Sequence, residues 1–317
     1  MLECKIFKMF WSVGKMKIGF VILHYQVMKM TQKCVRSIKK FVSDAVIVIV
    51  DNNSPDNSGK ELQKIYENDN DIICILNTEN IGFARGNNIG YKYLKNNYNC
   101  DYICCINNDT LITDRHFSEK VEQEYKRSNF AVLAPQARRK NYTIQNFDYH
   151  ISSLQDYENL LQYYESDKTL TDYMKRVSKR QFLLFKYPAL NMLLKFYYEI
   201  RKSDGYMVSY KEPVENIMLP GCFLIFSKVY IDIFDSAFDK RTFLYREEDL
   251  LYLRLKHYHL KSVYLPTLHI RHKENSSTNM LISNNEEKYQ FSRKNQINSL
   301  KIIVQILKNE ISIEDGI

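Results

Sequence analysis

The chain has 317 residues, 45% of them hydrophobic and 26% charged, so it can bury a full core as one large α/β domain or one and a half. It carries 45 lysines and arginines against 37 aspartates and glutamates, a formal charge of +8 that favours phosphate-bearing partners or an anionic surface. No apolar run approaches the roughly 20 residues that a bilayer span needs, which argues against a membrane-spanning protein.

The cysteines contain no CxxC pair, which argues against a zinc site and against a disulfide framework. Four of them fall in apolar, strand-like runs, where cysteine serves as a small core side chain. We therefore expect a reducing, cytoplasmic compartment. The seven cysteines are Cys4, Cys34, Cys74, Cys100, Cys104, Cys105 and Cys222.

Apolar strands alternate with helices from residue 17 to about 135, after a loose N-terminal extension at 1–15 that is too interrupted for a signal peptide. Strands that are apolar throughout predict an α/β fold with a mainly parallel, Rossmann-like sheet flanked by helices on both faces. The expected strands occupy 18–25, 45–51, 72–77 and 102–107, and the expected helices occupy 28–41, 59–68 and 88–97.

The alternation stops across 137–215, an aromatic and basic stretch that we interpret as a variable helical insertion. Within it, 175–202 holds eight lysines and arginines against Glu199 alone, which is +7 of the chain's +8. A basic amphipathic helix is typical of binding to an anionic membrane surface. A helix that covers the core and keeps a charged rim has the same pattern, so both interpretations stay open.

Regular structure is expected to resume after the insertion and to run to the end of the chain. The pattern predicts ordered segments at 216–228 and 238–260, a strand at 261–266, a further segment at 268–278 and a final helix at about 284–310.

Polar side chains follow each of the four expected strands of the first half. Parallel sheets bind ligands beyond the carboxyl ends of their strands, so we expect a ligand site along this edge. A separate Asp-x-Asp, at 69–71, precedes its strand and is interpreted as a turn on the opposite edge. The polar exits are His24 and Tyr25; Asp51, Asn52 and Asn53; 77–80; and Asn107, Asn108 and Asp109.

Seven short motifs appear in an order that resembles the family 2 glycosyltransferases of the GT-A fold. The resemblance is greatest to the rhamnosyltransferase-like branch that builds bacterial O-antigen and capsule polysaccharides. It implies a GT-A domain at 16–280, with the insertion at 137–215, and a C-terminal helical segment at 281–317. The motifs are VILHY, VIVDNNSPDNS, NTENIGFARGNNIGYKY, CCINNDTLIT, LPGCFLIFSK, FLYREEDLLYLRLK and HIRHKENSS.

The resemblance implies a nucleotide-sugar site at the first three motifs. Asp51 would bind the base or ribose, and Arg85 can neutralise a pyrophosphate that Gly82 and Gly86 allow to approach the backbone. A loop that only caps a helix has the same pattern, so that interpretation stays open. The candidate donor-binding residues are His24, Tyr25, Asp51, Asn53, Asn80, Gly82, Phe83, Arg85, Gly86 and Asn87.

A divalent cation, Mg²⁺ or Mn²⁺, is the cofactor that the resemblance implies. Asn107, Asn108 and Asp109 take the place of the family's metal motif, and one Asp with amide oxygens can hold a cation that keeps several waters. Asp109 is the preferred ligand and Asn107 a weaker, substrate-side candidate. His272 matches a histidine beside the metal or phosphates, with His269 and Lys273 as rivals.

Three consecutive carboxylates, Glu247, Glu248 and Asp249, are the candidates for the catalytic base. Neighbouring acids raise one another's pKa, which suits a base near neutrality. The dipole of a helix N-terminus also favours acids there, and it explains one or two of them without catalysis. The resemblance makes Glu248 the formal base and Asp249 the runner-up. It places Gly221 and Cys222 in the floor under donor and acceptor.

These inferences together predict an inverting, metal-dependent transfer of a sugar to a glycan acceptor, polyprenyl-linked, at the cytoplasmic face of the cell membrane. A nucleotidyltransferase would want a glycine-rich loop after the first strand, and HYQVMKMTQ has no glycine. A non-catalytic binding subunit of a polysaccharide assembly complex is the second alternative. Nucleic-acid binding is disfavoured, because the basic surplus is one local patch without a reading motif.

Overall fold

The structure, a computed structural model, describes residues 16–139, 144, 152–166, 211–273 and 285–317. The N-terminal extension at 1–15, the basic stretch at 175–202 and most of the predicted insertion lie outside the described residues.

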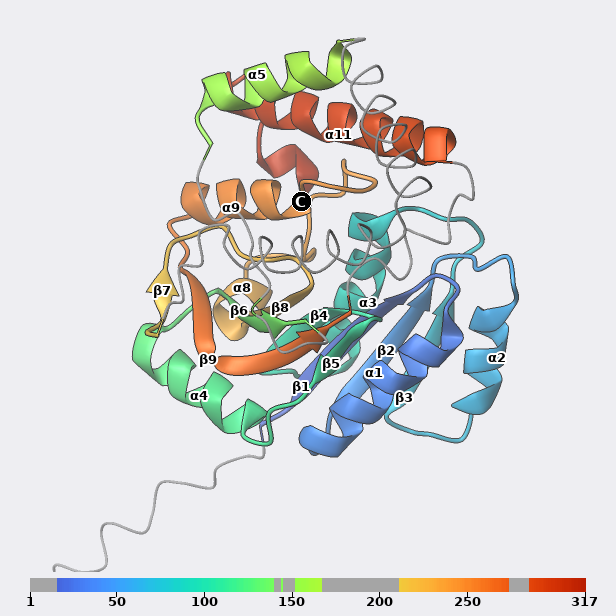
Figure 1. Cartoon of the computed structure of the whole chain (residues 1–317). Helices are drawn as coiled ribbons and strands as arrows, with labels where there is room; N and C mark the ends of the chain where they lie inside the picture. Colours follow the sequence, from blue (N-terminus) through green and yellow to red (C-terminus); the bar gives the residue numbers. More distant parts are fainter. Residues whose placement is uncertain (1–15, 140–143, 145–151, 167–210, 274–284) are drawn as a thin grey trace, which may run out of the picture.

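One sheet of nine strands runs through the described residues in the order β3-β2-β1-β4-β8-β6-β9-β5, with β7 paired to β9 (Figure 1). Its first half is parallel, because β2 and β4 flank β1 and β3 pairs with β2. These strands are continuous apolar runs, as strands covered on both faces must be. They are β1 (Ile18–His24), β2 (Val46–Asp51), β3 (Ile72–Leu76) and β4 (Tyr102–Asn107).

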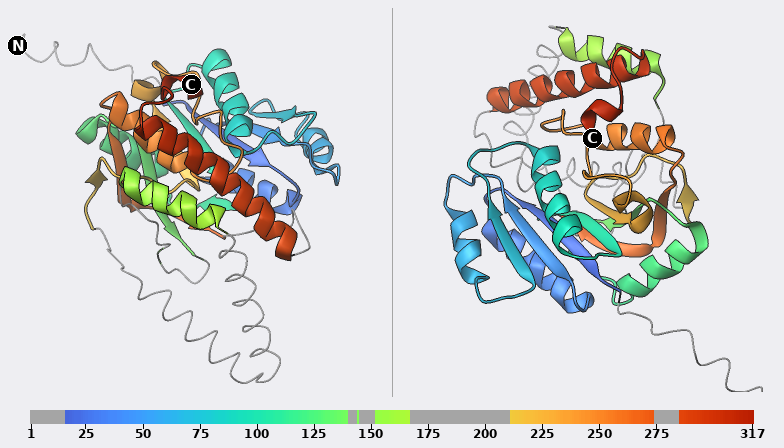
Figure 2. Two further views of the ribbon diagram at one scale, coloured as in Figure 1. Left: turned by 90° about the horizontal axis from the view of Figure 1, so that it is seen from above. Right: turned by 180° about the vertical axis from the view of Figure 1, so that it is seen from behind.

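Helices cover both faces of this half, which confirms the predicted α/β class (Figures 1 and 2). Successive side chains of a strand point to opposite faces. Phe20 of β1 accordingly packs in the cluster under α1, while Val21 packs with Tyr91 and Leu94 of α3. The three helices are α1 (Met28–Phe41), α2 (Ser58–Ile65) and α3 (Phe83–Asn97).

The second half of the sheet is mixed, since β8 runs antiparallel to β4 and β6 runs parallel to β9. β6 continues to Arg138, beyond the point near 135 where the strand pattern was expected to stop. A register shift between Pro135 and Gln136 lets the strand tolerate a proline, which has no N–H to pair. The strands are β5 (Thr110–Ile112), β6 (Val132–Arg138), β7 (Val214–Glu215), β8 (Phe223–Ser227) and β9 (Ser262–His272).

A helical layer lies above this end of the sheet (Figure 1). α11 runs beside α5, and Tyr157, Leu250 and Leu300 share the small core between them and α9. α11 agrees with the helix expected at 284–310, whereas α5 was not resolved as an element from sequence. The remaining helices are α4 (Phe117–Ser128), α5 (Leu154–Glu165), α8 (Lys228–Ile231), α9 (Glu247–His257) and α11 (Asn285–Leu307).

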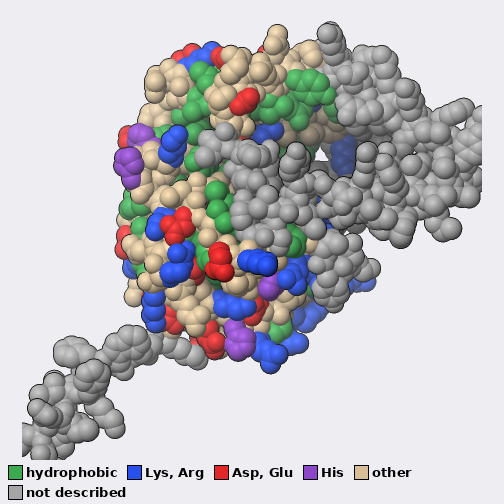
Figure 3. All heavy atoms as spheres, turned by 60° about the vertical axis from the view of Figure 1, so that its left-hand side comes forward, with side chains coloured by type: hydrophobic (Ala, Val, Ile, Leu, Met, Phe, Trp, Pro, Cys, Tyr) green, Lys and Arg blue, Asp and Glu red, His purple; other side chains and the backbone are tan. Residues whose placement is uncertain are grey.

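Acidic and basic side chains alternate on the face formed by α4 and β7 (Figure 3). Glu215 of β7 accepts from both Arg127, at 2.9 Å, and Lys261, at 3.0 Å. This part of the surface therefore carries paired charges rather than a basic patch.

Within the described part of the chain, no helix combines the length and hydropathy that crossing a membrane requires.

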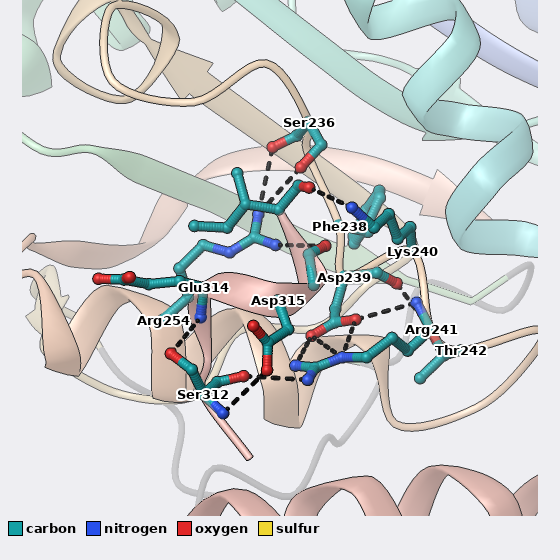
Figure 4. A network of polar contacts seen from close by, with 12 residues as sticks. Ser236, Phe238, Asp239, Lys240, Arg241, Thr242, Arg254, Ser312, Glu314 and Asp315 are labelled. Carbon is teal, nitrogen blue, oxygen red and sulfur yellow. Dashed lines mark hydrogen bonds and ion pairs between the residues drawn. The ribbon is translucent and has the colours of Figure 1, made fainter.

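A polar network ties the last residues of the chain to the loop that leads into α9 (Figure 4). The guanidinium of Arg241 binds Asp239 through two nitrogens and donates to Ser312 O at 3.0 Å. Arg254, only 1% exposed, donates to Tyr230 Oη at 2.7 Å and to Gly316 O at 3.4 Å. The loop is thereby fixed from one side by 312–317.

Replacing Arg254 with Met should remove these hydrogen bonds and leave their buried acceptors without a donor. We expect the free energy of unfolding in urea to fall by about 3 kcal/mol. The exposed Lys256 on the same helix supplies the control, since Lys256→Met should change stability by less than about 0.5 kcal/mol. Equal losses in the two variants would contradict this role for Arg254.

Candidate active site

A cavity of about 550 Å³ lies at the carboxyl ends of β1 and β4 and extends to α9 and α11. Asn107 N donates to Cys222 O at 3.0 Å, so the loop before β8 is attached to the end of β4 and forms part of the wall. Twelve of the residues predicted from sequence line the cavity: Tyr25, Asn80, Gly82, Phe83, Asn107, Asp109, Gly221, Cys222, Glu247, Glu248, Asp249 and His272.

Asp109 and His272 form a pair inside the cavity, with Oδ1 3.2 Å from Nε2. The pairing follows from the sheet, because β5 runs antiparallel to β9 with Thr110 opposite His272. The rival His269 instead contacts Arg138, at 2.6 Å. Lys273 donates its backbone N–H to Asp109 O at 3.1 Å. Two strands far apart in sequence thus deliver one carboxylate and one imidazole to the same point.

This pair has the chemistry of a partial cation site. A carboxylate is a hard oxygen ligand. An imidazole is a softer nitrogen ligand that suits Mn²⁺ at least as well as Mg²⁺. Asn107 and Asn108 bring amide groups to the same cavity wall. Among the described residues, no three His, Cys, Asp or Glu side chains gather as a metal cluster. The residues fit a cation that takes its other ligands from water or from a bound phosphate.

Glu248 lies half-buried in the opposite wall. Its carboxylate accepts a hydrogen bond from the backbone N–H of Gly221, and burial still raises its pKa above the ordinary value. A Cβ on residue 221 would lie 2.1 Å from Glu248 Oε1. Only glycine therefore leaves room for the carboxylate at this place. The backbone N–H of Gly221 favours one orientation of a carboxylate that reaches the cavity and can accept a proton there.

Glu247 is more deeply buried, and its Oε1 makes no hydrogen bond among the described residues. Burial, followed by the charge of Glu248, raises the pKa of Glu247 to about 8. Two adjacent carboxyl groups do not both ionise easily, and the more deeply buried Glu247 is the one whose ionisation burial opposes most.

Asp249 has structural partners. Tyr157 of α5 donates to Asp249 Oδ1 at 2.7 Å, and an Arg246 nitrogen lies 3.6 Å from the same oxygen. Burial and the charge of Asp249 raise the pKa of Tyr157. Asp249 therefore ties α9 to α5 more closely than it faces the cavity.

Gly82 joins the two halves of the cavity. Its φ of 86° lies in the left-handed region, and a Cβ there would come 2.4 Å from Phe243 O. Phe83 N donates to that same carbonyl at 2.7 Å. The loop after β3 and the loop before α9 are consequently in direct backbone contact.

Two predicted residues of the donor end lie beneath the cavity rather than in its lining. His24 is fully buried, with Nδ1 2.7 Å from Thr31 Oγ1 and Nε2 2.9 Å from Ser58 Oγ. Burial lowers its pKa, so the ring is neutral. Asp51 accepts from the Ser54 hydroxyl at 2.5 Å and is 7% exposed. Both side chains shape the turn after β2.

The other four predicted donor residues also lie outside the lining. Exposed Arg85 donates Nε to Lys240 O at 2.8 Å. A Cβ on Gly86 would lie 2.4 Å from Leu23, so this glycine allows close packing of α3 on β1. Asn87 donates to Phe83 O within α3. Asn53 is exposed, with a φ of 59°.

Several lining residues were given no individual role from sequence, although Asn52 was among the polar strand exits. Asn52, next to Asn53, binds Asn80 Oδ1 at 2.8 Å and Gly82 O at 3.1 Å and lines the cavity. The sequence VDNN shows that two Asn residues follow the strand. Only the register of the strand decides which of the two faces the cavity. Asn108, part of the predicted metal motif, also lines the cavity. The lining residues without a predicted role include Phe243, Tyr245, Arg246, Phe291 and Gln296.

The family assignment agrees with this geometry. Residues 20–234 match the profile of the family described as Glycosyl transferase family 2, and the chain belongs to that family. Among curated proteins, none matches the sequence. The carboxylates of α9 and His272 lie beyond the matched segment.

Solved structures of S. aureus TarS, residues 1–349, are similar in fold. One of them matches with a TM-score of 0.48 and 11% identity, covering 95% of this chain and 74% of the TarS chain. The complexes with UDP-GlcNAc and with UDP each match with a TM-score of 0.36 and 16% identity over 43% of this chain. In these two matches the chain covers 39% and 40% of the TarS 1–349 chain, which is less than half of its length.

The raised pKa of Glu247 makes stability depend on pH. Native Glu247 holds its proton more tightly than the same residue does in the unfolded chain. Its contribution to the free energy of unfolding is therefore fully present below the ordinary carboxyl pKa and is lost as pH rises through about 8. We expect the melting temperature of the wild type to fall more between about pH 5 and about pH 9 than that of Glu247→Gln.

The matched control is Glu79→Gln, which changes an exposed side chain and should keep the wild-type slope. Differential scanning calorimetry across the range measures all three proteins. Parallel curves for the wild type and Glu247→Gln would show that Glu247 ionises normally.

Proposed function

We propose that the protein is an inverting glycosyltransferase that moves a sugar from a nucleotide-sugar donor to a glycan acceptor. The observation that carries this proposal is the single cavity lined by the Asp109–His272 pair on one side and by Glu248 on the other. Family membership supports sugar transfer as the reaction. The two walls supply a place for a leaving group and a base for an incoming hydroxyl.

The donor's diphosphate would lie against Asp109 and His272. A divalent cation held there would offset the negative charge that develops on the departing diphosphate. Tyr25, Asn52 and Asn80 line the same end of the cavity and would orient the nucleotide through an aromatic ring and amide groups. Asp51 would act on the nucleotide through the turn that it shapes after β2.

Glu248 would accept the proton of the acceptor hydroxyl. That oxygen forms a bond to the anomeric carbon as the bond from this carbon to the diphosphate oxygen breaks, and the proton passes to the Glu248 carboxylate. Attack from the side of Glu248 and departure on the side of Asp109 invert the anomeric centre. Neutral Glu247 limits repulsion around the charged base.

The finer parts of the proposal come from the sequence motifs. They are transfer of a hexose, membership of the rhamnosyltransferase-like branch, and an acceptor that is a polyprenyl-linked glycan for O-antigen or capsule. We also propose a GT-A domain at 16–280 with its insertion at 137–215, and a helical segment at 281–317 that contributes to the same cavity through Phe291.

Purified protein with Mn²⁺ should hydrolyse at least one donor from a panel of UDP-, GDP- and dTDP-sugars, which identifies the nucleotide without the natural acceptor. Asp109→Ala and Glu248→Gln should each lower the transfer or hydrolysis rate by about 10²–10⁴-fold, because one removes the cation ligand and the other the base. Coupled detection of released nucleotide measures the rate.

The matched control is Asp114→Asn, which changes a carboxylate near Asp109 in sequence that salt-bridges Lys120 outside the cavity lining. It should keep its rate within about twofold. Full activity in both Asp109→Ala and Glu248→Gln would exclude these roles. A complete absence of donor hydrolysis, with nucleotide binding intact, would favour the non-catalytic binding subunit.

We further propose that 175–202 makes peripheral contact with an anionic membrane at the cytoplasmic face. The segment carries +7 in 28 residues, and each basic residue near an anionic surface contributes about 1 kcal/mol. The protein should therefore sediment with phosphatidylserine vesicles at low salt and detach as salt rises. A protein that remains in the supernatant, unaffected by charge reversal in 175–202, would exclude this contact.

A further inference from the structure

One side of the cavity is built from residues that lie beyond the segment matched by the family profile, which ends at 234. We call it the acceptor-side wall. It combines the loop before α9 with one side of α11, and Glu248 lies next to it in sequence and in the cavity lining. The acceptor-side wall consists of Phe243, Tyr245, Arg246, Phe291 and Gln296.

The backbone of the acceptor-side wall is strained. Tyr245 and Arg246 have φ values of 75° and 69°, two consecutive left-handed residues that are not glycine. Such conformations cost about 1–3 kcal/mol each and gather at functional sites. Here they stand directly before Glu247, the first residue of α9. This conformation places the side chains of Tyr245 and Arg246 in the cavity lining, close to the proposed base Glu248.

Contacts between the loop and α11 hold Arg246 in place. Its Nε donates to Gln296 Oε1 at 2.9 Å, and its Nη1 lies 3.6 Å from Asp249 Oδ1. A guanidinium has five N–H donors, so these two contacts leave donors that can reach hydroxyl oxygens of a ligand. The Gln296 amide adds two more donors at the same place.

The apolar part of the acceptor-side wall is aromatic. Phe243 and Phe291 meet edge to face, with ring centroids 6.0 Å apart and planes at 84°. Both rings are half-buried and line the cavity. Aromatic rings flanked by a few polar groups are the usual lining of a small-molecule site.

We propose that the acceptor-side wall binds one uncharged pyranose residue of the acceptor, an inference that rests on the proposed function. A pyranose has a flat C–H face for the aromatic rings and hydroxyls for Arg246 and Gln296. Asp249 offsets the charge of Arg246, and the carboxyl group of Glu248 lines the same cavity, which disfavours an anionic ligand. Phe291 and Gln296 of α11 are then specificity-determining residues that lie beyond both the profile-matched segment and the family motifs.

Saturation-transfer NMR can test the wall with methyl glycosides as probes. The panel contains the methyl glycosides of glucose, galactose, N-acetylglucosamine and rhamnose, with methyl glucuronide as the anionic comparison. At least one neutral probe should be saturated by the wild type, and its signal should fall at least fivefold in Phe291→Ala and in Gln296→Ala. Tyr163→Ala, which removes a 42% exposed ring of α5 outside the cavity lining, is the matched control and should keep the signal.

Thermal unfolding of each variant separates loss of binding from loss of the fold. Gln296→Ala removes only a polar side chain, so it still tests the proposal if Phe291→Ala is unstable. No signal from any neutral probe with the wild type, preference for the glucuronide, or an undiminished signal in folded Gln296→Ala would overturn the proposal. Wild-type donor hydrolysis is measured in parallel. Its absence beside the expected glycoside signals would refute the proposed reaction while the sugar site stands.

Discussion

The backbone contact between Gly82 and Phe243 is the constraint on which the rest of the site depends. The carbonyl of Phe243 accepts from Phe83 N at 2.7 Å, and any side chain at 82 would collide with it at 2.4 Å. This contact closes the parallel half of the sheet against the loop that leads into α9. The network of Arg241 and Arg254 holds the same loop from the other side. The side of the cavity that carries Asp109 faces the side that carries Glu248 because the loop before α9 is held by both of these sets of contacts.

Three consecutive acids acquire different properties from this arrangement. Glu248 accepts from the Gly221 N–H and reaches the cavity. Glu247 is buried, its Oε1 has no hydrogen-bond partner in the part of the chain that the structure describes, and burial raises its pKa to about 8. Asp249 is engaged by Tyr157. A helix dipole would favour acids at all three positions equally, so it does not account for the difference. Burial and hydrogen bonding give three adjacent carboxyl groups different environments within one turn of helix.

Much of the fold could be predicted because its first half consists of uninterrupted apolar strands, whose length and period are local properties of the sequence. The cavity edge could also be predicted, since polar residues such as Asp109 follow the strands directly. The choice between Asn52 and Asn53 could not, because a one-residue change of register reverses which side chain faces inward. Arg85 was expected beside a phosphate, yet tertiary packing directs it to Lys240 O. Pro135 concealed the continuation of β6, since a bulge rather than a break accommodates it.

The acceptor-side wall shows where prediction from local sequence ends. Phe291 and Gln296 lie on a helix whose sequence predicts only a helix, and they reach the cavity because α11 packs on α5 and Arg246 bonds to Gln296. Asp109 and His272, the residues proposed to hold the cation, lie at strand ends, where the sheet sets the geometry. Under the proposed function, residues on α11 that contact an acceptor can vary without disturbing Asp109, His272 or Glu248. A fold divided in this way can change its acceptor while it keeps its reaction.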